Sequence, residues 1–289
     1  MGLEALWFLL VYEGLLMKRN SFLLGALLTV FPFHFSAQAQ SLGDGKEGWD
    51  FSIGAGLIIA PSYVGDDSYQ ILAVPDIRVR YKDKFFASVQ EGVGYNVIHD
   101  EHWRVGPLVR YDFGRDEDGD SPFRIGGHKT DDLIGLGDVD GTAEVGAFVE
   151  YKLTPVTARL EVMHGAGGHE GMLGKGTLAY SGRMNLINAP VTYSFGPEVK
   201  FADSKYHEAY FGIDAGQSAS SGLQQYDTDA GILSYGVNAS VIVPVTDTLS
   251  SVFFANYSVL GNEAADSPLV EQRGSEGQSS AGLFVNYRF

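Results

Sequence analysis

The sequence of 289 residues contains no cysteine. It therefore cannot form disulfides, thiolate active sites, cysteine-based zinc centres or a lipid anchor on an N-terminal cysteine. Basic residues are also scarce, with 20 Lys and Arg against 36 Asp and Glu, and the net charge is −16. A protein that binds nucleic acid needs a basic surface to displace the counterions of the phosphate backbone, so this charge argues against a nucleic-acid partner.

Long apolar runs are missing everywhere except near the N-terminus. There, Met17-Lys18-Arg19 precedes the run FLLGALLTVF, and Ala37-Gln38-Ala39 follows it. This order predicts a secretory signal peptide that is cleaved after its A-x-A motif. Residues 1–16 contain two glutamates and fit no part of such a signal, so we interpret residues 1–39 as an upstream extension and a cleaved signal, with the true start at Met17. An uncleaved membrane anchor is the alternative.

After the signal no run reaches the ~20 apolar residues that a spanning helix needs. The chain is instead rich in Gly (37), Phe (18) and Tyr (15), which favours many strands and turns. From Trp49 to the end, apolar and polar residues alternate with period two, as in Val145, Ala147, Val149, Tyr151 and Leu153. Only Phe148 interrupts the polar face of that stretch.

A soluble sandwich and a transmembrane barrel share this period. The barrel is favoured because the runs often exceed the five or six residues usual in soluble strands, aromatic residues recur near their ends, and long acidic connections alternate with tight turns. We therefore predict one all-β domain over residues 40–289, a transmembrane antiparallel β-barrel with an even number of strands. Twelve strands are expected, near 48–60, 70–81, 84–97, 102–113, 139–153, 156–167, 173–186, 190–201, 206–216, 230–243, 248–260 and 277–289.

The sidedness of the connections is inconsistent with this count. The turns at 202–205 and 244–248 are expected on the side of the chain ends, with 217–229 and 261–276 opposite. The turn at 154–155 also belongs with the chain ends, yet three runs separate it from 202–205, where an even number is required. Ten strands is therefore the alternative to twelve.

The polar faces carry charges of both signs, which predicts a lumen of ion pairs. The basic set is Arg78, Arg80, Arg104, Arg110, Lys152, Arg159, Arg183 and Lys200. The acidic set is Asp76, Asp112, Glu144, Glu150, Glu161, Glu198, Glu208 and Asp214. The remaining acidic excess falls in the connections at 115–123 and 129–141, which we expect to be exposed loops.

No motif predicts catalysis, a cofactor or a metal. The segment HGAGGHEG (164–171) groups His164, His169 and Glu170, but its spacing matches no standard metal motif and further ligands would have to come from elsewhere. Asp116, Asp118 and Asp120 resemble the start of a calcium loop that lacks its invariant Gly and its bidentate Glu. No histidine lies in a nucleophile signature, so we predict a protein that is not an enzyme.

Several segments, in order along the chain, resemble the MipA/OmpV family of outer-membrane proteins, which is named for the MltA-interacting protein. The matching segments are GAGLIIAPSYVGDD (54–67), LIGLGDVDGTAEVG (133–146), GGHEG (167–171), the stretch 202–232 and ADSPLVEQRGSEGQSSAGLFVNYRF (265–289). The resemblance implies an outer-membrane location in a Gram-negative bacterium and contact with membrane lipid and lipopolysaccharide. It also implies a scaffold that brings a lytic murein transglycosylase and a murein synthase together, with the connections KLTP, FADSKY and PVTDT as candidate contacts. A small porin or channel and a surface adhesion protein are the alternatives.

The chain ends on a strand, AGLFVNYRF, with an aromatic residue as its last side chain. Leu283, Val285, Tyr287 and Phe289 share one face, which we expect to meet lipid, while Phe284 is the exception on the other face. This ending resembles the signal that barrels present to the barrel-assembly machinery. Pairing of this strand with the segment near 49–59 would close the barrel and leave no exposed edge in the bilayer.

We predict that deletion of Phe289 lowers the amount of folded protein in the outer membrane, because the assembly signal loses its terminal aromatic group. Quantitative immunoblotting of outer-membrane fractions, with and without heating before electrophoresis, measures the folded amount. A truncated protein that reaches normal membrane levels would contradict the prediction.

Overall fold

The computed structural model describes residues 48–186 and 189–289. The predicted signal peptide lies outside the described residues. Within them, no helix is both long enough and apolar enough to cross a membrane.

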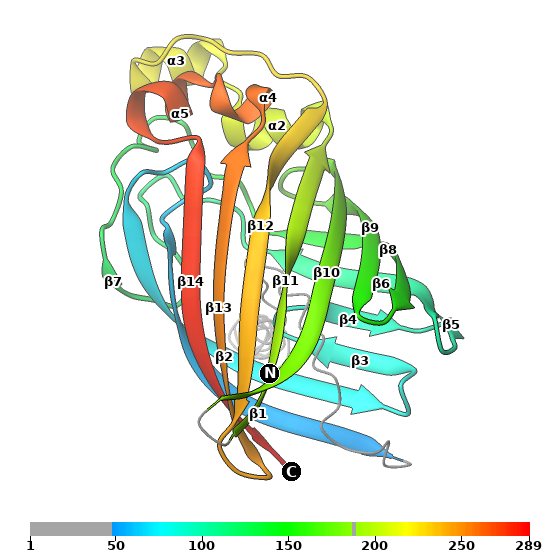
Figure 1. The fold of residues 1–289 in the computed structure, drawn as a ribbon. Coiled ribbons are helices and arrows are strands. Elements are labelled where there is room, and N and C mark those ends of the chain that lie inside the picture. Colours follow the sequence, from blue (N-terminus) through cyan, green and yellow to red (C-terminus); the bar gives the residue numbers. More distant parts are fainter. Residues whose placement is uncertain (1–47, 187–188) are drawn as a thin grey trace, which may run out of the picture.

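Twelve antiparallel strands form a closed barrel, which confirms the predicted fold class and strand number (Figure 1). The strands in this wall are β1 (Trp49–Pro61), β2 (Tyr69–Tyr81), β3 (Phe85–Ser88), β4 (Gly92–Tyr95), β6 (Trp103–Asp112), β8 (Thr142–Leu153), β9 (Val156–Ala166), β10 (Met172–Leu186), β11 (Ala189–Ala202), β12 (Gly231–Pro244), β13 (Leu249–Leu260) and β14 (Gly277–Arg288). Two short strands supplement it, with β5 (Ile98–His99) paired to β6 and β7 (Arg124–Gly127) paired to β2.

The barrel closes where β1 pairs with β14 on one edge and with β2 on the other. The β1–β14 register runs from Ser52 opposite Arg288 to Ile59 opposite Ala281. The predicted closure by the last strand is therefore confirmed. Because no water is available in the bilayer core, this pairing satisfies backbone groups that an open edge would leave without partners.

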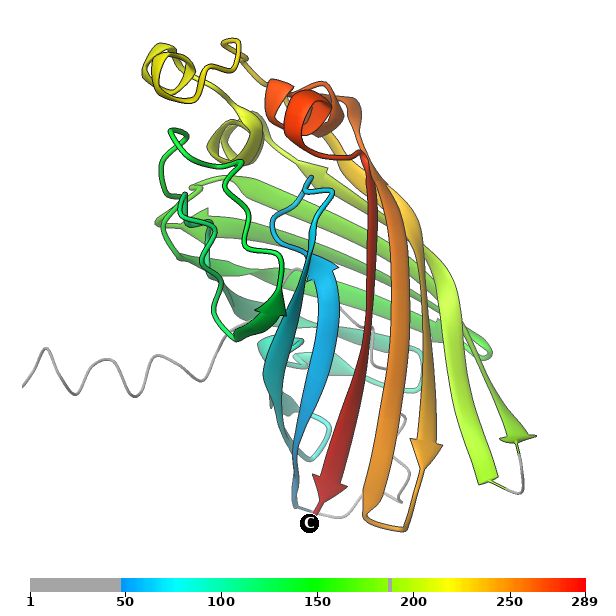
Figure 2. The same cartoon turned by 90° about the vertical axis from the view of Figure 1, so that its left-hand side faces the viewer.

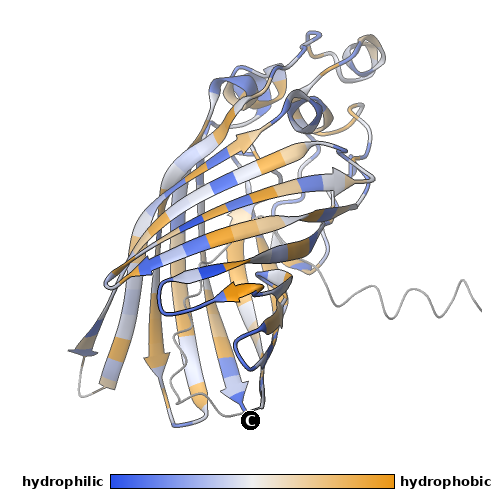
Figure 3. Ribbon diagram, turned by 90° about the vertical axis from the view of Figure 1, so that its right-hand side faces the viewer, coloured by the Kyte–Doolittle hydropathy of each residue, from blue (hydrophilic) through white to orange (hydrophobic). Residues whose placement is uncertain are grey.

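The strands alternate between a membrane face and a lumen face (Figure 3). On β1, Leu57 and Ile59 are about half exposed, while Ile58 and Ala60 between them are buried. Exposed aromatic residues gather near both ends of the wall, as in the interfacial girdles of outer-membrane barrels. They include Trp49, Phe51, Trp103 and Tyr287 at one end and Tyr69, Tyr111, Phe201 and Tyr257 at the other.

Two of the predicted strands were wrong, and the two errors cancel in the count. The run 84–97 is the hairpin of β3 and β4, which turns at residues 89–91. The run 206–216 is no strand but contains α2 (Ser204–Phe211), whose first turn is capped by the Asp203 side chain. The buried residues of α2 are Tyr206, His207, Tyr210 and Phe211. The period-two pattern that suggested a strand is formed by Ala209, Phe211 and Ile213, of which Ile213 lies beyond the helix.

This correction removes the conflict in sidedness. FADSKY leads into α2 at the end of the barrel opposite to the chain ends, so its predicted position beside them was wrong. Two strands, β9 and β10, now separate the turn at 154–155 from the next connection on that side. Glu208 and Asp214, predicted in the lumen, lie instead on α2 and at the N-cap of α3 (Ala215–Ser221). We call the barrel end that carries the chain ends the terminal end and the other the loop end.

A helical cap covers the loop end (Figure 2). It consists of α2, α3, α4 (Asn262–Ala265), α5 (Pro268–Arg273) and the connection 113–141. One apolar cluster joins Tyr210 and Phe211 to Leu260 and Val270, and a second joins Leu133 to Ile213 and Leu269. The connection 113–141 contains eight acidic and three basic residues. Most of its acidic side chains are exposed, as predicted, whereas Leu133 and Leu136 are buried.

The two aromatic exceptions to the alternation pack inside the barrel. Phe148 lies against Phe86 with ring centroids 5.7 Å apart, and Phe284 stacks on Phe254 at 6.2 Å. Val89, from the turn between β3 and β4, belongs to the same apolar cluster as Phe254 and Phe284. Apolar side chains therefore fill part of the lumen at these levels.

Gly56 makes room for the Phe284 ring, since a Cβ atom at this position would lie 2.3 Å from Phe284 Cδ1. We predict that Gly56→Ala destabilises the barrel by about 1–3 kcal/mol, the usual cost of overpacking a filled interior. Gly176→Ala is the matched control, because its Cβ would meet Leu160 and Val199 at an ordinary 3.4 Å. The temperature at which the folded band is lost on electrophoresis measures the difference, and equal temperatures for both variants would contradict the prediction.

Candidate functional site

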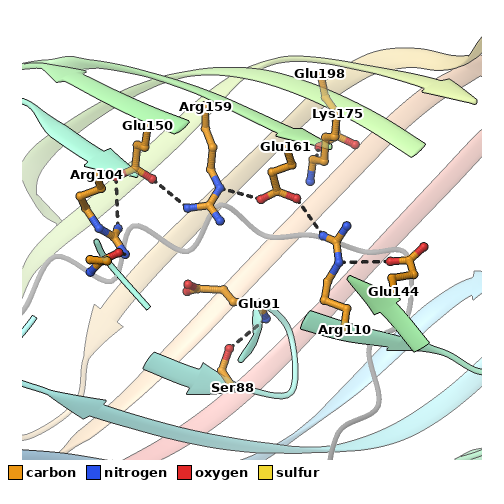
Figure 4. A network of polar contacts seen from close by, with 11 residues as sticks. Ser88, Glu91, Arg104, Arg110, Glu144, Glu150, Arg159, Glu161, Lys175 and Glu198 are labelled. Atoms are coloured by element: carbon orange, nitrogen blue, oxygen red, sulfur yellow. Dashed lines mark hydrogen bonds and ion pairs between the residues drawn. The ribbon is translucent and has the colours of Figure 1, made fainter. Parts of the chain in front are cut away.

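The lumen holds a continuous row of paired charges along β6, β8 and β9 (Figure 4). Arg110 contacts Glu144 at 3.3 Å and Glu161 at 2.8 Å. Arg159 continues the row, at 2.6 Å from Glu161 and 3.2 Å from Glu150. Arg104 ends it at 3.1 Å from the other oxygen of Glu150. The predicted lumen of ion pairs is therefore confirmed.

A second group extends the charged wall onto β10 and β11. Glu198 lies 3.0 Å from Lys175 and 3.4 Å from Lys200. Lys175 was missing from the predicted lumen set. The facing wall, from β12 to β14, is lined by neutral polar groups, which include Ser234, Asn238, Asn256, Ser258, Gln278 and Ser280. The lumen thus has one charged wall whose charges pair with each other and one neutral wall.

The segment HGAGGHEG divides its two histidines between opposite faces. His164 points outward from β9, whereas His169 is buried in the turn before β10. Gly165 permits this, because a Cβ there would lie 2.3 Å from the imidazole Cε1. The His169 Nε2 atom lies 3.6 Å from Glu144 Oε1, and Asp112 completes a cluster whose polar atoms all lie within 4.8 Å of one another.

The hydrogen bonds of His169 decide what this cluster can bind. The Gly171 backbone N–H donates to Nδ1 at 3.0 Å, so Nδ1 acts as an acceptor and the ring proton sits on Nε2. Nε2 therefore presents an N–H to the two carboxylates, whereas a metal ligand must present a lone pair there. The cluster consequently has the chemistry of a hydrogen-bond donor beside two acceptors, although Nε2 makes no hydrogen bond within the described residues. The His169 backbone N–H, which donates to Thr142 Oγ1 at 3.2 Å, anchors the β9–β10 turn to the barrel wall.

In the acidic run at 116–120, the carboxylates of Asp116 and Asp120 contact other groups of the same loop. Asp116 accepts a hydrogen bond from the Asp118 backbone N–H, and Asp120 contacts Lys129 at 2.9 Å. The hydrogen bond from Lys129 lowers the pKa of Asp120. These contacts shape the turn and leave no convergent set of oxygens from this run among the described residues.

A cavity of about 220 Å³ lies between the charged wall and the cap. Its roof includes Tyr206 and Tyr210 of α2 and Arg115 of the long connection. Burial raises the pKa of both tyrosine hydroxyls above the usual range, so both remain protonated donors at neutral pH. Burial lowers the pKa of Arg115, whose guanidinium donates to the Tyr210 carbonyl oxygen at 2.5 Å.

A second arginine joins two other parts of the cap. Arg273, at the end of α5, donates to the carbonyl oxygens of Asp132 at 2.6 Å and Ser221 at 2.5 Å. Together with Arg115, it ties the long connection to α2, α3 and α5. The cap is therefore held by charged hydrogen bonds as well as by its apolar clusters.

The predicted assembly residues lie where the alternation placed them. Leu283, Val285 and Tyr287 are exposed on the membrane face, and Phe289 is 72% exposed. The Phe289 backbone N–H donates to Phe51 O at 3.1 Å, which extends the pairing with β1 to the last residue. Their role as an assembly signal stays a prediction.

We predict that Arg110→Met destabilises the barrel by about 3–5 kcal/mol, because Glu144 and Glu161 lose a shared, buried partner. Arg124→Met is the matched control, since its pair with Asp120 is 3.8 Å long and the Asp120 side chain is 64% exposed. Such pairs contribute about 0–1 kcal/mol. Urea unfolding in detergent micelles, followed by tryptophan fluorescence, measures both variants. Equal stability losses would contradict the assignment of the paired row as a structural element.

The comparisons with known proteins give one family match. The family model described as MltA-interacting protein MipA matches residues 53–289. No curated protein matches the chain in sequence. Among solved structures, an outer-membrane channel from Pseudomonas putida F1 has a TM-score of 0.45 at 11% identity, with 88% of this chain and 100% of that chain covered. The NanC porin has a TM-score of 0.40 at 8% identity, with 83% and 100% covered.

Proposed function

The chain belongs to the family of the MltA-interacting protein MipA, and we propose that this outer-membrane barrel is a non-enzymatic scaffold for murein-remodelling and murein-synthesis enzymes. The observation that supports the proposal is that side chains and a cap obstruct the lumen. Its charges pair with each other, apolar side chains fill part of its cross-section, and a cap covers its loop end. A barrel with such an interior has its outer surface and its connections available for partners.

The terminal end supplies the contact surface in this proposal. In this proposal the predicted signal peptide directs export, and the end that carries the chain ends faces the periplasm, next to murein. Its connections are short and internally braced. Asp100 Oδ1 accepts from the backbone N–H groups of His102 and Trp103, and Thr246 Oγ1 accepts from those of Thr248 and Leu249. Preformed turns lose little conformational entropy when a partner binds.

The predicted contact list changes with the corrected topology. KLTP and PVTDT stay at the terminal end, whereas FADSKY is excluded because it leads into the cap. The exposed side chain of Val245, within PVTDT, is a candidate apolar contact at this end.

An adhesion role is the second candidate, and the acidic cap favours it over a channel. The connection 113–141 is held by Arg115 and Arg273 and so presents its acidic residues on a fixed surface. A channel would require a water path through the lumen, where Arg110, Glu161 and Val89 now lie. The paired row and the apolar layer both disfavour it.

Affinity isolation from detergent-solubilised envelopes tests the scaffold. We expect the intact barrel to recover a lytic transglycosylase and a murein synthase, and Val245→Lys to reduce their recovery several-fold. Ile134→Lys is the matched control, because Ile134 is similarly exposed but lies at the loop end, 52% against 57% for Val245.

Heat-dependent mobility on electrophoresis must show that each variant is folded. A folded intact barrel that recovers neither enzyme would refute the scaffold. Equal losses in the two variants would refute its placement at the terminal end.

A further inference from the structure

Four polar atoms on the wall of the cavity below the cap have no hydrogen-bond partner among the described residues. They are Gln70 Oε1 on β2, Ser280 Oγ on β14, the Tyr210 hydroxyl on α2 and Arg115 Nε. The Gln70, Ser280 and Tyr210 side chains are each more than nine-tenths buried. A buried polar group without a partner costs about 1–3 kcal/mol, so such groups mark a place where another molecule supplies the partner.

The four atoms come from different sides of the same space. Gln70 is held in place because its amide N–H groups donate to the carbonyl oxygens of Pro61 and Ser62, which leaves the amide oxygen toward the cavity. Tyr210 is fixed through its backbone carbonyl, which accepts from Arg115. Its hydroxyl interacts with the Asp112 side chain on the cavity wall. Gln70, Tyr210 and Arg115 are thus held in place by contacts that leave the Gln70 amide oxygen and the Arg115 Nε atom unpaired.

The chemistry of the free atoms selects the class of ligand. Gln70 Oε1 is an acceptor, Arg115 Nε is a donor, and the two hydroxyls are both. A ligand hydroxyl donates and accepts at once, so a polyhydroxylated molecule satisfies the mixed set. The same cavity offers Phe254, Leu72 and Leu260 as apolar wall, which suits the C–H face of a sugar ring.

The charge and the volume of the cavity narrow the class of ligand further. Lys175 and Arg110 beside the cavity already have acidic partners, at 3.0 Å from Glu198 and 2.8 Å from Glu161. Arg115 has no ion pair among the described residues, but Asp112 and Asp116 also line the cavity and disfavour an anionic ligand. A charged ligand would have to displace these pairs, whereas a neutral one need not. The volume of about 220 Å³ is below the roughly 300–1,000 Å³ of pockets for drug-sized ligands, which limits the ligand to a small molecule.

We propose that the cavity below the cap binds a neutral sugar of about one ring through Gln70, Ser280, Tyr210 and Arg115. The cavity lies at the loop end, where residues 61–64 and 113–116 line it together with the strands. This inference is independent of the scaffold proposal, which concerns the opposite end of the barrel.

The test is a titration of the full-length mature barrel with D-glucose and N-acetyl-D-glucosamine by saturation-transfer NMR. The detergent must be free of sugar, for example an alkyl amine oxide, because alkyl glycosides would present competing head groups. Glucuronate and glucosamine serve as charged analogues. We expect saturable binding of at least one neutral sugar that is tighter than binding of the charged analogues.

Two variants remove only one hydroxyl each. Ser280→Ala should keep the fold, since the Ser280 hydroxyl has no hydrogen-bond partner among the described residues. Tyr210→Phe keeps the ring that packs in the cap and removes only the hydroxyl beside Asp112. Each change should weaken binding about five-fold, the effect of one hydrogen bond. Tyr235→Phe on the membrane face is the control and should bind like the intact protein.

The proposal is overturned if no neutral sugar gives a saturable signal, which would mean that the cavity holds only water. It is also overturned if the charged analogues bind more tightly, or if both hydroxyl variants, shown to be folded by heat-dependent mobility, bind as well as the control.

Discussion

Closure of the backbone hydrogen-bond ladder is the constraint on which the rest of this structure depends. In the bilayer an unpaired backbone group has no water to bond, so β1 must pair with both β2 and β14. Once the ladder is closed, the pleat sends alternate side chains to lipid and to the lumen. Most charged residues of the strands thereby point into the interior of a narrow barrel.

This inward direction of the charged side chains explains the organisation of the lumen. Charges that cannot reach bulk water must find partners across neighbouring strands, and the register places Arg110 directly opposite Glu144 and Arg159 opposite Glu150. The same register leaves room for Phe148 and Phe284, which fill the lumen with apolar volume where no charged pair is needed. Between the paired wall and the cap, the remaining space is lined by groups whose hydrogen-bonding capacity is partly unused. The side chains in the middle of the barrel therefore stabilise the fold, and the space near the loop end is available for a small ligand.

The cap shows how a strand pattern can conceal a helix. In 206–216, Ala209, Phe211 and Ile213 recur with period two, as in a strand. Asp203 instead caps a helix whose buried residues are spaced by one turn. The local signal that distinguishes the two was the aspartate before the segment, whose side chain accepts from the Tyr206 N–H. The opposite error in 84–97 has the same origin. Gly92, with a left-handed backbone, ends a turn inside what looked like one continuous strand.

The sequence by itself determined the fold class, the face to which most strand residues point, the location of most lumen charges and the closing role of the last strand, because each follows from period-two alternation along a local stretch. The resemblance of its segments also pointed to the family that the comparisons show. Only the tertiary structure decided the cap, the partners of each charge and the cavity. Gln70, Tyr210 and Ser280 are separated by 140 and 70 residues in the chain, and no local pattern predicts that a helix from one connection will roof strands from both ends of the sequence.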